Sequence, residues 1–213
     1  MEIGPYRHIK KLGEGAFGEV FQAKTPRTAT FYRKHPVVAI KVIKNSNAYR
    51  TDWKAKEEAN LLKRLNHPNI VKYLNSFVDT ERQFCIIMEY CNFGDMNMIM
   101  PEEPDEGIVW GFMSLIANGL EFIHGQGIVH RDLKPDNILC KLDAIVDDRD
   151  DDGDFINVSC IKVKIGDFGI AKLMTKKHWD NYYTRTAIGK KIVLWSITNT
   201  RKTRLIFDSL GDF

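Results

Sequence analysis

The sequence HRDLKPDN at residues 130–137 decides how this chain is interpreted. Three further stretches accompany it in chain order, namely GEGAFGEV at 13–20, VAIK at 38–41 and DFG at 167–169. Each stretch stands in the local setting that it would need, and their joint occurrence is far less expected by chance than any one of them. The four stretches therefore form one functional pattern rather than four unrelated turns.

The glycine-rich stretch is predicted to join two strands. A lone G-x-G-x-x-G pattern is a weak indication, because three glycines in a turn mostly mark a tight loop. Here Val20 and its neighbours continue as a second strand, whereas a dinucleotide-binding fold would place a helix there. Gly13, Gly15 and Gly18 would let backbone N–H groups approach phosphate oxygens closely. The pattern favours a loop that covers phosphates.

Lys41 lies within the apolar run VVAIKVI at residues 37–43. A lysine on a strand usually occupies a solvated edge, but an inward-facing one requires an anionic partner. The natural partner is Glu58, on a helix predicted at 52–67, and Glu57 is the alternative. A lysine held by a carboxylate can orient the α and β phosphates of a nucleotide.

The stretch from His130 carries a carboxylate, a lysine and an amide close together. The carboxylate of Asp132 can accept or orient the proton of an incoming hydroxyl, and the amide oxygen of Asn137 can face a magnesium ion. Lys134 adds positive charge near a transferred phosphoryl group. Asp167 would bridge a second magnesium ion to phosphates, because hard cations prefer carboxylate oxygens.

These motifs together resemble the eukaryotic protein kinase superfamily, over about residues 6–189. The lysine in HRDLKPDN resembles the serine/threonine branch, and the activation segment is similar to that of NIMA-related kinases. The resemblance implies an α+β, bilobal fold: an antiparallel β small lobe with one helix, and an incomplete, mainly helical large lobe. It places the small lobe at 1–91, the partial large lobe at 92–189 and a divergent tail at 190–213.

The resemblance also implies a reaction: ATP- and Mg²⁺-dependent transfer of the γ-phosphate to serine or threonine hydroxyls of a protein substrate. The residues that it assigns to catalysis are Asp132, Lys134, Lys41 and Glu58. Those that it assigns to metal binding are Asn137 and Asp167. The ATP-binding positions that it implies are Leu12, Gly13, Gly15, Gly18, Val20, Ala39, Lys41, Met88, Glu89, Cys91, Asp95 and Leu139.

Within that ATP-binding set the resemblance gives each residue a role. The apolar side chains that would enclose the adenine are Leu12, Val20, Ala39 and Leu139. Met88 would be the gatekeeper, and Glu89–Cys91 would be the hinge that offers backbone hydrogen bonds to the base. Asp95 would touch the ribose or the substrate. Plain core packing is compatible with the apolar positions as well.

Other positions are expected to support or regulate the reaction. His130 and Arg131 would be structural, and Arg131 would also pair with a phosphorylated activation loop. Thr186 resembles the phosphoacceptor of that loop, and Thr184 is the second choice. This resemblance implies an upstream activating kinase.

An insertion at 141–160 departs from the family pattern and is rich in aspartate. It contains the D-x-D-x-D-G spacing of a calcium-binding loop in Asp148, Asp150, Asp152 and Gly153. The twelfth position is Ser159 rather than a bidentate glutamate, and predicted strands rather than helices flank the loop. An acidic, solvated loop is therefore favoured over calcium binding.

The residues after Gly189 also depart from the family, because the peptide-positioning loop, the APE motif and the helices that follow in kinases do not appear. We therefore expect a truncated kinase of reduced activity; the alternative is a non-catalytic nucleotide-binding or decoy fragment. The helix predicted at 106–127 sharpens this expectation. Its apolar residues cover about half of its circumference, wider than the stripe of about 100° that one packing partner needs.

Composition sets the remaining expectations. The chain has 213 residues, 44% of them hydrophobic, which suffices for a buried core. Its net charge of +3, from 31 basic and 28 acidic side chains, gives no reason to expect nucleic acid or a membrane surface as partner. The four cysteines lack close C-x-x-C spacing, which favours reduced, mostly buried thiols. With a polar N-terminal stretch and no long apolar run, we expect a cytoplasmic or nuclear location.

Overall fold

A computed structural model of the chain describes residues 2–15, 18–43, 48–101, 104–142 and 161–173. The chain divides into two compact units. Unit 1 comprises Met1–His67 and Val71–Cys91, and unit 2 comprises Pro68–Ile70 and Asn92–Phe213. The acidic insertion from residue 143 onward, Thr184, Thr186 and the tail at 190–213 lie outside the described residues.

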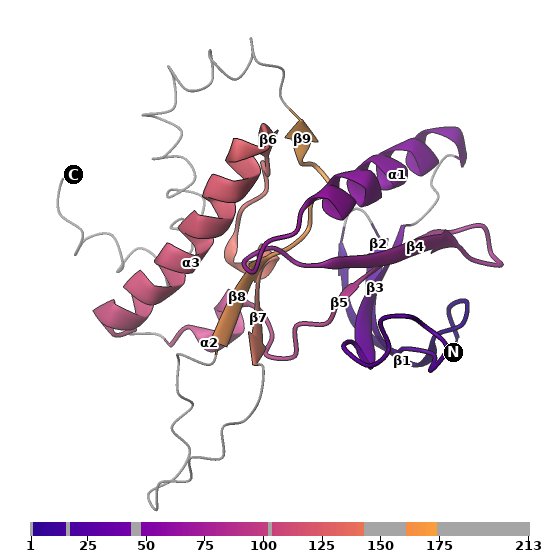
Figure 1. Cartoon of the computed structure of the whole chain (residues 1–213), viewed down its shortest axis with the longest axis horizontal. Coiled ribbons are helices and arrows are strands. Elements are labelled where there is room, and N and C mark those ends of the chain that lie inside the picture. The colour runs from indigo at the N-terminus through magenta and orange to yellow at the C-terminus, as the bar shows by residue number, and fades with distance from the viewer. Residues whose placement is uncertain (1, 16–17, 44–47, 102–103, 143–160, 174–213) are drawn as a thin grey trace, which may run out of the picture. The chain divides into compact units, whose positions relative to one another are not determined.

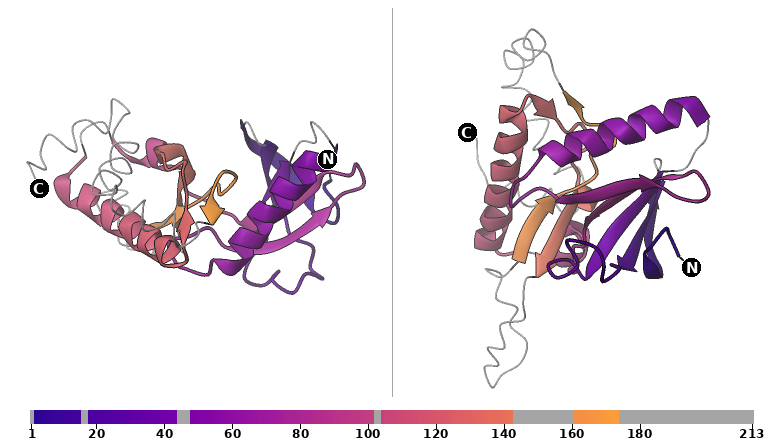
Figure 2. Two further views of the ribbon diagram at one scale, coloured as in Figure 1. Left: turned by 90° about the horizontal axis from the view of Figure 1, so that it is seen from above. Right: turned by 45° about the vertical axis from the view of Figure 1, so that its right-hand side comes forward.

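Unit 1 is a five-stranded antiparallel sheet with one helix (Figure 1). Its elements are β1 (Arg7–Gly15), β2 (Gly18–Lys24), β3 (Val37–Ile43), α1 (Ala48–Arg64), β4 (Tyr73–Val78) and β5 (Phe84–Glu89). The strands lie in the order β1-β2-β3-β5-β4. Helix α1 contacts β4 and β5 and lies along the sheet, as Figure 2 shows. The predicted α+β fold with an antiparallel small lobe is confirmed.

The two faces of this sheet differ in chemistry. Side chains alternate between the faces along a strand, so Val38, Ile40 and Val42 of β3 share one face. They belong to an apolar cluster composed of Ile3, Tyr6, Phe21, Ala23, Val38, Ile40, Val42, Cys85 and Ile87. Ala39 and Lys41 point to the opposite face. The apolar cluster thus covers one face of the sheet, and the opposite face carries Lys41.

Helix α1 has the apolar periodicity expected from the sequence. Ala55, Ala59 and Leu62 form the buried face of the helix. Leu65, just after the helix, is also buried. The helix ends at Arg64 rather than at the predicted 67. The run NIVKYLNSFVD at 69–79 predicts a strand that starts at Asn69, but β4 begins at Tyr73. The reason is that the intervening Pro68–Ile70 segment joins unit 2 instead of extending the strand.

Unit 2 is built from short strands and one long helix. Its described elements are α2 (Met96–Ile99), α3 (Glu106–Gly125), β6 (Ile128–Val129), a 3-10 turn (Pro135–Asn137), β7 (Ile138–Leu142), β8 (Ile161–Ile165) and β9 (Lys172–Leu173). Strand β6 pairs with β9, and β7 pairs with β8, both antiparallel. Helix α3 packs against β8 and β6 (Figure 1).

Helix α3 has a wide apolar face, of which only part is buried. Asp105 caps its N-terminus by accepting the N–H groups of Gly107 and Ile108, which are otherwise unpaired. The deeply buried residues are Val109, Phe112, Ile116, Gly119 and Ile123. Apolar residues on both flanks stay partly exposed, and Trp110 is 51% exposed. The described part of unit 2 therefore covers only the central stripe of the helix.

The small β7–β8 sheet has neighbours along both sides. On the β7 side, Cys140 accepts from the N–H of Phe93 and donates its own N–H to Gly94. The side-chain amide of Asn92 donates to the Leu142 carbonyl and accepts from the Leu142 N–H, as the backbone of a neighbouring strand would. On the β8 side, Ile70 forms a parallel bridge with Ile165.

No disulfide joins any two of the described cysteines, Cys85, Cys91 and Cys140. Cys85 and Cys140 are buried, and burial raises the pKa of each thiol to about 12, so both stay protonated near neutral pH. Cys91 is half-buried. No helix among the described residues is long and apolar enough to span a bilayer.

Candidate active site

The buried ion pair of unit 1 joins strand β3 to helix α1. The Nζ atom of Lys41 lies 2.8 Å from Oε1 of Glu58, and the two side chains are only 7% and 5% exposed. Of the two glutamates that the sequence left open, the structure pairs Lys41 with Glu58, whereas Glu57 is exposed. Because burying an ion costs several kcal/mol, each charge here depends on the other for compensation.

Strand register brings more of the predicted positions to the Lys41 face. Residues directly opposite in antiparallel strands point to the same side of a sheet. Val20 is paired with Lys41, and Met88 is paired with Ala39, which shares a face with Lys41. Ala39 and Met88 are each 9% exposed. Leu12 lies at an irregularity between β1 and β2 and is 43% exposed.

The three glycines of the G-x-G-x-x-G motif, which lie at the ends of β1 and β2, differ in whether the structure leaves room for a side chain. Gly18 has a φ of +145°, and an added Cβ would lie 2.0 Å from the carbonyl oxygen of Val42. Gly18 is therefore required by the sheet itself. An added Cβ at Gly13 or Gly15 would meet nothing within 4 Å. The protein's own packing does not explain glycine at these two positions.

The predicted hinge residues are already partly engaged within unit 1. The N–H of Glu89 donates to the carbonyl of Lys72 over 2.9 Å, and the N–H of Lys72 donates to Oε1 of Glu89 over 2.9 Å. Glu89 is 4% exposed. The N–H of Glu89 is thus occupied by a contact within unit 1.

Asp95 has a structural task that the sequence reasoning missed. Its Oδ1 atom accepts the N–H groups of Asn97 at 2.9 Å and Met98 at 3.2 Å, which caps helix α2. An aspartate immediately before a helix is a common cap, so the residue type carried this signal. Leu139, the predicted floor of the adenine site, is half-buried on β7 and bridges Asp95.

In unit 2, Asp132, Lys134 and Asn137 come together through direct contacts. Oδ2 of Asp132 lies 3.1 Å from Nζ of Lys134 and accepts from Nδ2 of Asn137 at 3.0 Å. Nδ2 of Asn137 also donates to the Asp132 carbonyl at 2.7 Å, which fixes the orientation of the amide. The hydrogen bond to Asp132 raises the pKa of Lys134, so this amine stays charged.

His130 ties this loop to the DFG segment. Its Nε2 donates to the carbonyl of Gly166 at 2.8 Å, while Nδ1 accepts from the N–H of Asp132 at 3.3 Å. The ring contacts Phe168 edge-on with centroids 4.8 Å apart. His130 is 2% exposed, and burial lowers its pKa, so the neutral imidazole that this arrangement needs is favoured. These contacts agree with the expected structural role.

Two residues here have the left-handed backbone that glycine normally adopts. The φ angles are +69° at Arg131 and +52° at Asp167. Such conformations cost about 1–3 kcal/mol and persist only where surrounding contacts impose them. Arg131 donates from Nε to the carbonyl of Ile170 at 2.6 Å, and Oδ1 of Asp167 accepts from the N–H of Gly169 at 3.3 Å. Local strain therefore coincides with the HRD and DFG motifs.

The donor set of this loop fits Mg²⁺ better than a closed metal site. Magnesium takes oxygen ligands, usually one or two carboxylates together with phosphates and water. The amide nitrogen of Asn137 faces Asp132, so its carbonyl oxygen is the group left for a cation. The carboxylate of Asp167 likewise carries oxygens of the kind that Mg²⁺ takes as ligands. Among the described residues, no three His, Cys, Asp or Glu side chains cluster as they would around zinc.

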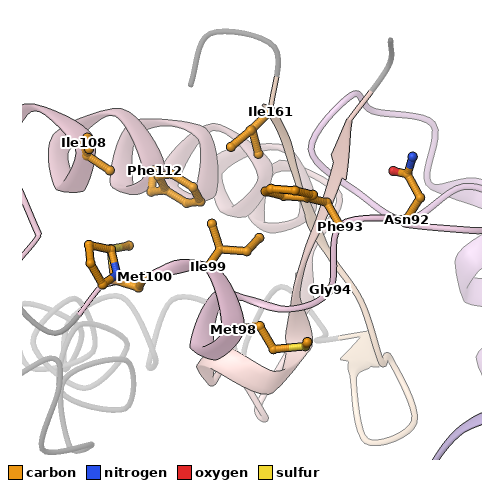
Figure 3. Close-up of a pocket in the computed structure, with 10 residues that line it drawn as sticks. Asn92, Phe93, Gly94, Met98, Ile99, Met100, Ile108, Phe112 and Ile161 are labelled. Atoms are coloured by element: carbon orange, nitrogen blue, oxygen red, sulfur yellow. The ribbon is translucent and has the colours of Figure 1, made fainter. Parts of the chain in front are cut away.

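A separate pocket of about 540 Å³ lies within unit 2 (Figure 3). Its mainly apolar lining consists of Asn92, Phe93, Gly94, Met98, Ile99, Met100, Pro101, Ile108, Phe112 and Ile161. Figure 3 shows Phe93, Phe112 and Ile161 gathered around one space. None of the predicted site residues lines it, so it is distinct from the phosphate and metal positions.

Comparison with known proteins identifies the family. The model of the protein kinase domain matches residues 6–191, and the chain belongs to this family. Cytokinesis protein sepH of Aspergillus terreus is 34% identical over 176 residues, covering 82% of the chain. Serine/threonine-protein kinase ULK1 of Homo sapiens is 33% identical over 81% of the chain, and the human serine/threonine-protein kinase Nek5 is 33% identical over 86%.

The matched region is a small part of each relative. The chain spans 11% of the length of sepH, 15% of ULK1 and 23% of Nek5. The three identities are nearly equal, so the similarity does not select one kind of kinase. The recognition of a protein kinase similar to the serine/threonine branch is nevertheless confirmed.

Proposed function

We propose that the chain transfers the γ-phosphate of ATP, with Mg²⁺, to serine or threonine hydroxyls of protein substrates. The observation that carries this proposal is the buried Lys41–Glu58 pair. A buried ion pair often stabilises a protein no more than apolar residues of similar volume would, so stability alone does not explain it. A fixed ammonium group beside strands that carry Val20, Ala39 and Met88 is suited to a nucleotide.

In unit 1 the residues bind and orient the nucleotide. Glu58 holds Lys41 so that the ammonium group orients the α and β phosphates. Gly13 and Gly15, which have open space where a side chain would be, let the backbone approach phosphate oxygens. The apolar positions on the Lys41 face enclose the adenine, and the backbone at Cys91 donates to its edge.

In unit 2 the residues position the acceptor and the metal. Asp132 accepts or orients the proton of the substrate hydroxyl, and Lys134 places a charge near the transferred phosphoryl group. The carbonyl oxygen of Asn137 and the carboxylate of Asp167 hold Mg²⁺. The bound ion offsets the negative charge of the phosphates. The strained backbone at Asp167 supports such a role, because strain is retained mainly where function needs it.

A reduced activity is also proposed, on the basis of helix α3. Its flanks are partly exposed within the described part of unit 2, and Trp110 is 51% exposed. Poorly supported catalytic loops lose rate, because phosphoryl transfer depends on accurate positioning. The alternative, a non-catalytic nucleotide-binding module, rests on the same observation. Truncation, activation at Thr186 and an intracellular location stay predictions.

A kinase assay on the purified full chain tests the proposal. We expect incorporation of phosphate into serine and threonine of a generic protein substrate, abolished by EDTA. Asp132→Asn should lower the rate by about 10²–10⁴-fold, the range of a general acid–base contribution. Asp136→Asn is the matched control, because this exposed carboxylate of the same loop has no proposed role.

Thermal unfolding with ATP and Mg²⁺ separates the two candidates, since a ligand of the native state stabilises it. Stabilisation without phosphate transfer would select the non-catalytic module. Equal rates for wild type and Asp132→Asn would contradict the catalytic role of Asp132. A chain that shows neither stabilisation nor transfer would contradict the proposal altogether.

A further inference from the structure

The segment Pro68–Ile70 lies between α1 and β4 in the sequence but belongs to unit 2. It runs beside β8, where the N–H of Ile165 donates to the carbonyl of Asn69 at 2.9 Å and Ile70 forms a parallel bridge with Ile165. The buried amine of Lys164 donates to the carbonyls of Pro68 at 2.9 Å and Ile70 at 3.4 Å. The segment is thus fastened to β8 by backbone and side chain together.

The side chain of Asn69 joins this segment to two other elements. Its Nδ2 donates to the carbonyl of Val163 on β8 at 3.0 Å, and its Oδ1 accepts from Nδ2 of Asn118 on α3 at 3.1 Å. Asn69 is 5% exposed. Both ends of the buried amide are therefore used, as burial of a polar group requires.

Helix α3 meets this junction at Gly119, where there is no room for a side chain. An added Cβ would lie 2.9 Å from Cδ1 of Ile165 and 3.0 Å from the carbonyl oxygen of Asn69. The approach lets Asn118, the neighbouring residue, reach Asn69. At this point α3, β8 and the 68–70 segment are in direct contact. We call the contact the Asn69 junction; it consists of Asn69, Asn118, Gly119, Val163 and Ile165.

The junction lies directly before the proposed metal ligand. Asp167 follows Ile165 by two residues, and the intervening Gly166 is held by the carbonyl of Asn137 and by His130, each at 2.8 Å. Asp167 itself has a φ of +52°. A left-handed aspartate needs its flanking backbone fixed from outside. Asn69 contributes to this by binding the carbonyl of Val163 and the N–H of Ile165, both on β8.

We propose that Asn69 is a positioning residue for Asp167. Its side chain binds Val163 in the middle of β8 and Asn118 on α3, and its carbonyl binds Ile165 at the end of β8. Together these contacts fix the direction from which the Asp167 carboxylate reaches Mg²⁺. The role in metal binding rests on the proposed function, whereas the ordering of residues 163–169 does not. Asn suits the position because one amide both donates to a strand carbonyl and accepts from α3.

Amide hydrogen exchange on the ligand-free full chain tests the ordering. Asn69→Ala should raise exchange of residues 163–169 by about tenfold, since its side chain loses both hydrogen bonds. Asn118→Ala should have a smaller effect, because it removes only the bond to α3. The control Ile123→Val removes a buried methylene from the same helix but none of the hydrogen bonds of the junction, so exchange of this segment should stay close to that of the wild type. Equal exchange in Asn69→Ala and wild type overturns the proposal.

A Mg²⁺ titration in the presence of ADP, followed by thermal unfolding, tests the link to the metal. We expect the half-saturating Mg²⁺ concentration to rise about 3–10-fold in Asn69→Ala. It should stay unchanged in Ile123→Val, which represents a change that only destabilises the protein. Asn69→Asp keeps the volume and the acceptor but loses the donor, so it serves if the alanine variant fails to fold.

The outcomes separate the two proposals. An unchanged Mg²⁺ requirement in the Asn69 variants overturns the positioning role. A wild-type chain that does not respond to Mg²⁺ and ADP contradicts the proposed function instead, and hydrogen exchange then decides whether Asn69 orders residues 163–169.

Discussion

The two units hold their proposed functional side chains by different means. In unit 1, Lys41 projects from a strand and Glu58 from a helix, so backbone regularity and burial fix their positions. In unit 2, Asp132 and Asp167 lie in segments without regular secondary structure, and single hydrogen bonds between side chains and backbone fix them. The proposed functional side chains of unit 1 are thus placed by regular elements, whereas those of unit 2 are placed by individual polar contacts.

The largest expected effect tests the dependence of unit 1 on buried charge. Lys41→Met leaves Glu58 buried without its cation, which should cost about 3–5 kcal/mol in the free energy of unfolding. The double variant Lys41→Met, Glu58→Leu should recover most of this loss, because apolar residues replace both charges. Urea denaturation measures both.

Lys11 provides the control for that experiment. It pairs with Glu14 and Glu19 on an exposed part of the same sheet, so Lys11→Met should change stability little. If Lys41→Met and Lys11→Met were equally mild, the buried pair would not be essential to the sheet.

The next effect separates two glycines of the same loop. Gly18→Ala forces a Cβ onto the Val42 carbonyl at a φ of +145°, which should cost about 2–4 kcal/mol. Gly13→Ala should change stability by less than about 0.5 kcal/mol, because its site is open, but should weaken nucleotide binding. Chemical denaturation and nucleotide-dependent thermal shifts provide the two readouts. Normal nucleotide affinity in Gly13→Ala would remove the reason proposed for that glycine.

The smallest effect concerns the pH dependence of unit 2. Burial outweighs the hydrogen bond to Gly166 and the nearby carboxylates and lowers the pKa of His130 in the folded protein. The unfolded chain then binds more protons below about pH 6.5, so stability is full above that pH and falls as the pH drops, by at most about 1.4 kcal/mol per unit.

The variant His130→Gln should show a flatter dependence between pH 5 and 7. It removes the titrating ring and keeps a side-chain N–H donor for Gly166. Burial also lowers the pKa of His124, so some slope should remain. Denaturation midpoints at each pH measure the difference, and identical profiles for wild type and variant would assign the pH dependence to other groups.

The sequence predicted the periodic parts of the fold well. The five strands, the helix at 48–64 and the helix at 106–125 follow from alternating or helical apolar patterns, and burial of Ala55, Ala59 and Leu62 agrees with that periodicity. The family match confirms the kinase resemblance that the four motifs carry. Local patterns sufficed because each of these elements depends mainly on its own residues.

What the sequence missed depends on contacts between distant residues. The pattern placed Asn69 inside a strand, but its partners Asn118 and Val163 are far away in the chain. The width of the apolar face on α3 likewise did not reveal which part would be buried, because that depends on the neighbours that pack on it. Asp95 was interpreted through the resemblance alone, and its capping role was overlooked.

The hydrogen bonds on both sides of β7 and β8 have a consequence for self-association. Unpaired strand edges are templates on which other chains add, which leads to aggregation. Here Asn92, Phe93 and Gly94 bind the N–H and carbonyl groups of Cys140 and Leu142. Asn69 binds the carbonyl of Val163 and the N–H of Ile165. This two-stranded sheet is thus closed to intermolecular strand addition at these positions, by residues that are not themselves part of a strand.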